Sequence, residues 1–140
     1  MTTGYKLTTQ NMTTHGDFKW ALGHTAITSG EGDLCGPGWL HFYGDPLLAV
    51  LLNPIHANID NPRLFEAIAG PTQEHDRGLK SGATQLTLIR ELPLPAVTLA
   101  QRVAFAKNCA AFAAEVAKGP RTSPDEILMA LMDCAYEAVS

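Results

Sequence analysis

Apolar and polar residues alternate along much of the first two thirds of the chain. The alternation predicts strands over residues 4–8, 39–43, 63–69 and 83–92. A further strand is expected over 18–23, extended or followed by another at 24–27. Its apolar side would face the core through Phe18, Trp20 and Leu22.

The strand over 83–92 has the clearest alternation in the chain. In a regular strand, side chains at every second position share a face. One face would hold Leu86, Leu88 and Arg90, and the other Thr87, Ile89 and Glu91. The intervening segment 73–78 is polar and is expected to be a loop.

A short helix is predicted directly after the strand at 39–43. Asp45 supplies an N-cap carboxylate and Pro46 suits the first helical position. The helix is expected to run from Pro46 to Leu52 and to end at Asn53-Pro54, because proline disfavours a helical residue before it. Its residues are almost all apolar, so it should be buried.

After Pro95 the chain becomes alanine-rich and its apolar residues recur at helical spacing. Thr98 is expected to cap a helix that ends at Gly119-Pro120. A capping box at residues 123–126 starts a second helix over 123–139. The two helices should form an antiparallel hairpin, and its wide apolar surface predicts a homodimer.

These elements predict an α+β fold. We expect a small, mainly antiparallel sheet with a short buried helix, followed by a C-terminal antiparallel helical hairpin. The 140 residues suit a single domain, 1–140, with a β-rich part at 1–95 and the hairpin at 96–140. Hydrophobic residues make up 46% of the chain, enough for a substantial core.

Charge and composition narrow the classes of partner. Charged residues are 17% of the chain and the net charge is −4, so no basic face for nucleic acid is expected. The N-terminus lacks a signal-peptide pattern and no apolar run reaches membrane-spanning length. We therefore expect a cytoplasmic protein with three reduced cysteines.

The chain has no recognised catalytic or metal-binding motif. Cys35, His41 and His56 could approach a metal ion, but paired ligand arms of structural zinc sites are missing. Cys35 is the candidate nucleophile nearest a histidine, and a structural thiol is the alternative. The glycines at 30–44 match no phosphate-binding loop. We predict no catalytic residues, no metal and no cofactor.

The glycine- and proline-containing segment Cys35-Gly36-Pro37-Gly38-Trp39-Leu40-His41 is similar to one in a family of short uncharacterised proteins encoded mostly by phages and prophages. The resemblance extends over about residues 4–115, and its other matching segments include Gly4-Tyr5-Lys6, Asp45-Pro46-Leu47-Leu48-Ala49, Asn53-Pro54-Ile55-His56-Ala57 and Ile89-Arg90-Glu91. It implies a viral accessory protein acting in the host cytoplasm, without a settled activity.

The order of elements also resembles, more weakly, ADP-ribosyltransferase folds, in which a late strand bears a glutamate. Glu91 would take that place, but the early His or Arg of those folds is missing. The likeness implies a nucleotide- or NAD-binding pocket, with or without group transfer, and its ligand-binding residues would be Tyr5, His41, Tyr43, Arg63 and Glu91.

The leading functional hypothesis is a phage-encoded accessory protein that binds a host protein or protein complex. Its target could be a component of host defence or transcription. The alternatives are the nucleotide-binding, ADP-ribosyltransferase-like domain and an oligomeric structural accessory protein. No membrane partner is expected.

Overall fold

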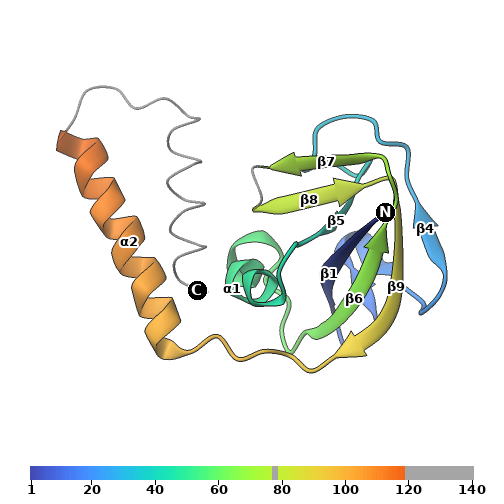
Figure 1. Cartoon of the computed structure of the whole chain (residues 1–140), viewed down its shortest axis with the longest axis horizontal. Helices are drawn as coiled ribbons and strands as arrows, with labels where there is room; N and C mark the ends of the chain where they lie inside the picture. Colours follow the sequence, from blue (N-terminus) through green and yellow to red (C-terminus); the bar gives the residue numbers. More distant parts are fainter. Residues whose placement is uncertain (77–78, 119–140) are drawn as a thin grey trace. The chain divides into compact units, whose positions relative to one another are not determined.

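The computed structural model describes residues 1–76 and 79–118, and the chain divides into two compact units, residues 1–95 and 96–140. The first unit has the predicted α+β architecture (Figure 1). Its elements are β1 (Thr2–Thr8), β2 (Thr13–Thr14), the short 3₁₀ helix η1 (His15–Asp17), β3 (Phe18–Lys19), β4 (Thr25–Ile27), β5 (Leu40–Phe42), α1 (Pro46–His56), β6 (Arg63–Ala69), β7 (Gln73–Asp76), β8 (Lys80–Ala83) and β9 (Gln85–Leu92).

Two antiparallel sheets share a bent pair of strands. A four-stranded sheet has the order β1-β6-β9-β4 and a three-stranded sheet the order β5-β8-β7. β6 continues into β7 through residues 70–72, and β8 into β9 through Thr84. Backbone hydrogen bonds from Gly70 to Gln85 (2.9 Å) and from Thr84 to Thr72 (3.1 Å) keep the pair together through the bend.

The main core lies where side chains of the two sheets meet. Because β1, β6 and β9 are adjacent, their alternate residues form one continuous apolar face. The buried cluster comprises Trp20, Leu40, Phe42, Phe65, Ala67, Ala69, Ala83, Leu86 and Leu88. A second cluster joins α1 to the other face of the β1–β6 pair, through Ala49, Leu7 and Leu64.

The predicted start of α1 is confirmed and its predicted end is wrong. The Asp45 carboxylate accepts hydrogen bonds from the backbone amides of Leu47 (2.8 Å) and Leu48 (3.2 Å). The helix continues through Pro54 to His56. Pro54 stands in the last turn, where it removes only its own amide hydrogen bond from the helix. The turn that follows is held by the Asn53 side chain, which accepts from the amide of Ile59 and donates to its carbonyl.

The N-cap of α1 supports a stability prediction. Asp45→Ala should lower the free energy of unfolding by about 1 kcal/mol, because two amides at the helix start lose their acceptor. Urea unfolding of the full chain measures the loss. Asp45→Asn is the matched control, since it retains a side-chain oxygen acceptor and should stay close to the wild type. Equal losses in both variants would contradict a capping role.

Residues 18–23 differ from the prediction. The strand is only two residues long, and Trp20 alone of the three apolar residues is buried. Phe18 is 40% exposed and Leu22 is 48% exposed. The period-two pattern fails because the backbone leaves the ladder after Lys19 and reaches a turn at Gly23, which has a φ of 77°.

A β-bulge changes the faces expected for the strand over 83–92. Glu66 pairs with Arg90, but the next residue, Ala67, pairs with Leu88. Ile89 is therefore the extra residue, and the alternation of β9 shifts by one position after it. Glu91, opposite Phe65, consequently shares a face with Leu88 rather than with Ile89.

The segment expected to be a polar loop contains strand β7, which pairs with β8 in a hairpin. Its residues are polar because β7 lies at the edge of its sheet, where both sides of the strand remain in contact with water. The pattern of alternation that reveals a half-buried strand is therefore absent from β7.

In the second unit, the predicted helix after Thr98 is present as α2 (Leu99–Lys118). Thr98 and Gln101 cap it reciprocally, each accepting the other's backbone amide on its side chain, at 3.1 and 2.9 Å. The predicted helix over 123–139 lies outside the described residues, and the homodimer through the hairpin stays a prediction. No helix in the part of the chain described here is long and apolar enough to cross a membrane.

Candidate functional site

Tyr43, directly after β5, and His56, the last residue of α1, form a polar pair in which Tyr43 is partly buried and His56 is exposed. The Tyr43 hydroxyl lies 2.5 Å from Nδ1 of His56, and the rings stack with their centroids 5.8 Å apart. Burial raises the pKa of Tyr43 far above its usual value. Burial, reinforced by the positive charge of Lys80 and opposed by Asp76, lowers the pKa of His56. Both groups are therefore uncharged at neutral pH, and the Tyr43 hydroxyl donates its hydrogen to Nδ1 of His56.

His41, on β5, is held by a loop carbonyl. Its Nε2 is hydrogen-bonded to the backbone oxygen of Leu34. Burial lowers the pKa of His41. The Leu34 bond opposes this, and the charges of Lys80 and Lys6, together with that of His56 when it is protonated, add to it. Its imidazole is therefore neutral near pH 7, and Nε2 donates to the carbonyl. This interaction gives His41 a structural role in anchoring the 29–38 loop to β5.

Lys80 brings the same loop into contact with β8. Its Nζ donates a hydrogen bond to the Cys35 sulfur over 3.2 Å, and Cys35 is exposed. Neither Lys80 nor His56 belongs to the five predicted binding residues. Lys80 could not have been found from the sequence, because it follows a polar stretch without periodicity. Among the residues that the structure describes, no three or more His, Cys, Asp or Glu side chains gather as metal ligands.

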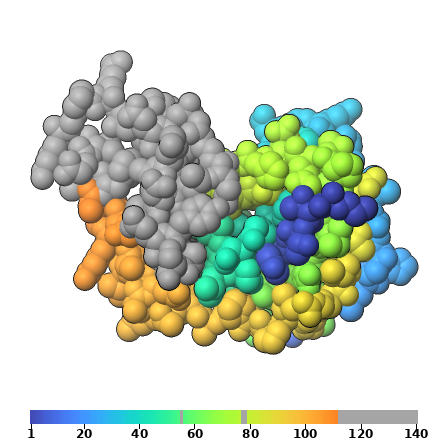
Figure 2. Space-filling model, viewed as in Figure 1, coloured from blue at the N-terminus to red at the C-terminus, as the bar shows by residue number. Residues whose placement is uncertain are grey.

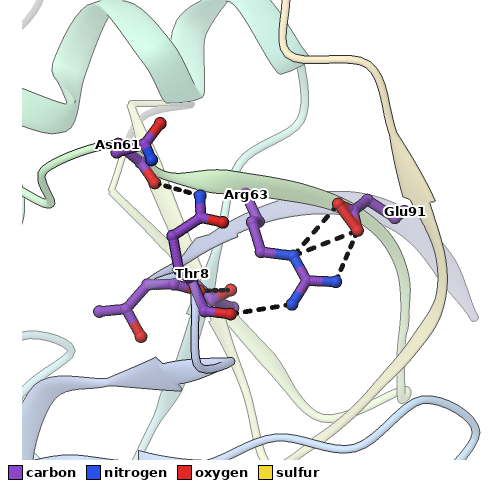
Figure 3. Close-up of polar contacts among 6 residues, drawn as sticks. Thr8, Asn61, Arg63 and Glu91 are labelled. Carbon is purple, nitrogen blue, oxygen red and sulfur yellow. Dashed lines mark hydrogen bonds and ion pairs between the residues drawn. The ribbon is translucent and has the colours of Figure 1, made fainter.

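Arg63 and Glu91 form an ion pair at the end of the larger sheet (Figure 3). Nε of Arg63 is 3.1 Å from both carboxylate oxygens, and Nη2 is 2.6 Å from one of them. Nη1 donates to the Gln10 carbonyl at 3.0 Å, and the Gln10 side chain donates to the carbonyl of Asn61. Hydrogen bonding between the partners raises the pKa of Arg63 and lowers that of Glu91.

The five predicted binding residues are divided between two faces of the sheet. Tyr5 exchanges two backbone hydrogen bonds with Tyr43, both of 2.8 Å, which bridge β1 to the chain after β5. Tyr5 pairs with Glu66 in the β1–β6 ladder, whereas Arg63 pairs with Thr8. The two pairs are three positions apart along the ladder, and three is an odd offset, so Tyr5 and Arg63 point to opposite faces. The geometry does not assemble the five around one ligand.

A shallow cavity of about 240 Å³ lies elsewhere, between β3 and the edge strand β4. It is lined by Phe18, Lys19, Trp20, Ala21, His24, Thr25 and Ala26. The Phe18 and Trp20 rings are 4.9 Å apart, and Trp20 donates to the Thr14 hydroxyl over 2.9 Å. Leu22 and Ile27, which belong to the same segment of the chain, are also apolar and are 48% and 69% exposed. We call residues 18–27 the aromatic arm.

The larger and smaller sheets with helix α1 define a small α+β domain, in which Arg63 pairs with Glu91 and Arg90 with Glu66, and in which a shallow groove is lined by Phe18 and Trp20. The chain belongs to a family described as a domain of unknown function (DUF7666), which it matches over residues 2–100. This match carries no indication of a phage origin or of a likeness to ADP-ribosyltransferases. No curated protein and no solved structure matches the chain.

Proposed function

We propose that this domain binds an extended segment of another protein along the aromatic arm. The observation that carries the proposal is an apolar groove placed directly beside an open strand edge. β4 pairs with β9 on one side, and on the other side it has no strand partner among residues 1–76 and 79–118. In Figures 1 and 2 this blue part of the chain stands at the right-hand side of the β-rich unit.

An open strand edge binds extended segments because its free amides and carbonyls can continue the ladder. The three residues of β4 provide only a short ladder, so side-chain contacts must supply much of the affinity and the selectivity. Phe18, which lines the groove, and Ile27, the last residue of β4, are large, exposed apolar side chains. A segment with apolar residues at alternate positions would bury them.

The charge of the groove narrows the chemistry of the segment further. Lys19 and His24 line the cavity, and no carboxylate does. An acidic residue among the apolar ones would therefore complement the groove. Because the sequence resembles phage-encoded proteins, the bound segment would belong to a host protein, such as a component of defence or transcription.

A displayed library of random linear peptides, selected on the full chain, tests the proposal. We expect the enriched peptides to alternate apolar residues and to carry an acidic one. Phe18→Glu should weaken them by about tenfold or more, because it places a charge in the apolar groove. Binding is measured by titration calorimetry with one enriched peptide.

Ile89→Glu is the matched control, since it introduces the same charge at an apolar residue of β9 that is 42% exposed and outside the groove. It should leave the affinity unchanged. Two results would overturn the proposal: a selection without enriched peptides, or enriched peptides that tolerate Phe18→Glu as well as Ile89→Glu.

A further inference from the structure

The contact between Cys35 and Lys80 joins two reactive side chains that are 45 positions apart in the sequence. The thiol is exposed, and the amine lies at the first residue of β8. None of the ion pairs within residues 1–76 and 79–118 involves Lys80. Neither side chain takes part in the groove of the aromatic arm, so the contact has no role in the proposed function.

The fold places these two side chains together through the residues next to them. The Leu34 carbonyl is bonded to His41, and the Leu34 side chain packs on Gly82, two residues after Lys80. A β-carbon at Gly82 would lie 2.6 Å from Cδ1 of Leu34 and 3.0 Å from Cβ of Trp39, so glycine lets the loop approach β8 this closely. The amide of Gly36 closes a turn onto the Asp33 carbonyl at 2.8 Å. These contacts of Leu34 and Gly36, the two neighbours of Cys35 in the chain, fix the position of Cys35.

We propose that Cys35 and Lys80 form a sulfur–nitrogen crosslink when the thiol is oxidised by a peroxide. The thiol first attacks the peroxide, which gives a sulfenic acid and one water molecule. The Lys80 ammonium loses a proton to water, and the resulting amine attacks the sulfur. The S–N bond forms as the S–O bond breaks, and hydroxide leaves with the amine proton as a second water molecule. One thiol, one amine and one hydrogen peroxide thus yield one sulfenamide and two water molecules.

The crosslink is a reversible modification. A thiol reductant attacks the sulfenamide sulfur, releases the amine and restores Cys35 through a mixed disulfide. While it is present, the bond ties the 29–38 loop to β8 covalently. The 3.2 Å separation of the two atoms means that little movement of either segment is needed to form the bond.

Oxidation of the full chain with equimolar hydrogen peroxide, followed by peptide mass spectrometry, tests the proposal. The expected product is a linked pair of peptides containing Cys35 and Lys80, lighter by two hydrogen atoms than their sum. Dithiothreitol should return both peptides to their original masses. Digestion at acidic residues avoids dependence on cleavage at the modified lysine.

Lys80→Arg is the matched variant, because it keeps the positive charge and the hydrogen-bond donors but removes the primary amine. It should reduce the linked pair by about tenfold or more and leave a Cys35 sulfenic acid that dimedone traps. The proposal is overturned if wild-type Cys35 yields only sulfenic or sulfinic acid, a disulfide, or links to other lysines. A linked pair of undiminished yield in Lys80→Arg would also overturn it.

Discussion

Gly4→Ala should destabilise the protein by about 3 kcal/mol, near the upper end of what overpacking a core costs. Gly4, on the edge strand β1 of the larger sheet, pairs with Ala67 of β6. A β-carbon at this position would lie 2.3 Å from Cδ2 of Phe42, which is 2% exposed. The ring is enclosed by the core and cannot move away without displacing its neighbours. Chemical denaturation monitored by circular dichroism measures the loss.

Gly44→Ala is the control for this substitution. A β-carbon at Gly44 would have no neighbouring atom within 4 Å, and its backbone is not in the left-handed region. The variant should be as stable as the wild type or gain a few tenths of a kcal/mol, because alanine restricts the unfolded chain.

A second control separates the clash from other effects of Gly4→Ala. If the clash with the Phe42 ring is the cause, the two positions are coupled. The double variant Gly4→Ala/Phe42→Leu should then lose less free energy of unfolding than the two single variants lose in total, because leucine lacks the ring edge. Additive losses would show that the ring is not the obstacle.

Lys6→Met should stabilise the protein at pH 7 by about 1–3 kcal/mol, since methionine fills the space without a charge. Lys6 lies on the core side of β1, opposite Phe65. Its Nζ donates to the His41 carbonyl over 2.6 Å and lies 5.1 Å from the centre of the Trp20 ring. No carboxylate of the described residues pairs with it. Burial lowers the pKa of Lys6 to about 8.

The pH dependence follows from this shift. Below pH 8 the folded chain must hold a charged, buried amine. Between pH 8 and 10.5 the folded form of Lys6 is neutral while the unfolded form is still protonated, so the unfolded state binds more protons. The contribution of Lys6 to the free energy of unfolding of the wild type should therefore become more favourable as the pH rises from 8 to 10.5. The difference in stability between Lys6→Met and the wild type should shrink over the same range.

Lys6→Arg and Lys19→Met are the controls for this prediction. Arginine stays charged across the window, so its variant should be less stable than the wild type and should show no gain with pH. Lys19 is exposed, and its replacement by methionine should change little. Thermal unfolding at pH 7 and pH 10 provides the comparison. If Lys6→Met is less stable than the wild type at both pH values, the burial of the Lys6 amine does not destabilise the protein, and the prediction is wrong.

The sequence pattern of a segment predicted its structure correctly where that structure depends only on residues within the segment. The alternation over 63–69 predicts β6 with its observed bounds. Asp45-Pro46 and Thr98 place the starts of α1 and α2, because capping depends on residues within one turn. The change of composition after Pro95 coincides with the division between the two units.

Local patterns misled where a neighbouring strand decides the outcome. Trp20 is buried and Phe18 is not, although both stand in the same alternating run. β7 is a strand because β8 pairs with it, and its own polar residues do not reveal this. The bulge at Ile89 depends on the register with β6, and it is what brings Glu91 to the face of Arg63.

The candidate sites depend on long-range contacts in the same way. The sequence contains Cys35, His41 and their glycine-rich loop, and it suggests turns and a structural thiol. Only the packing of that loop on β8 places the sulfur of Cys35 beside the amine of Lys80. The open edge of β4 likewise exists because the sheet ends there. Pairing energies between distant segments decide both features, and no pattern within either segment encodes its partner.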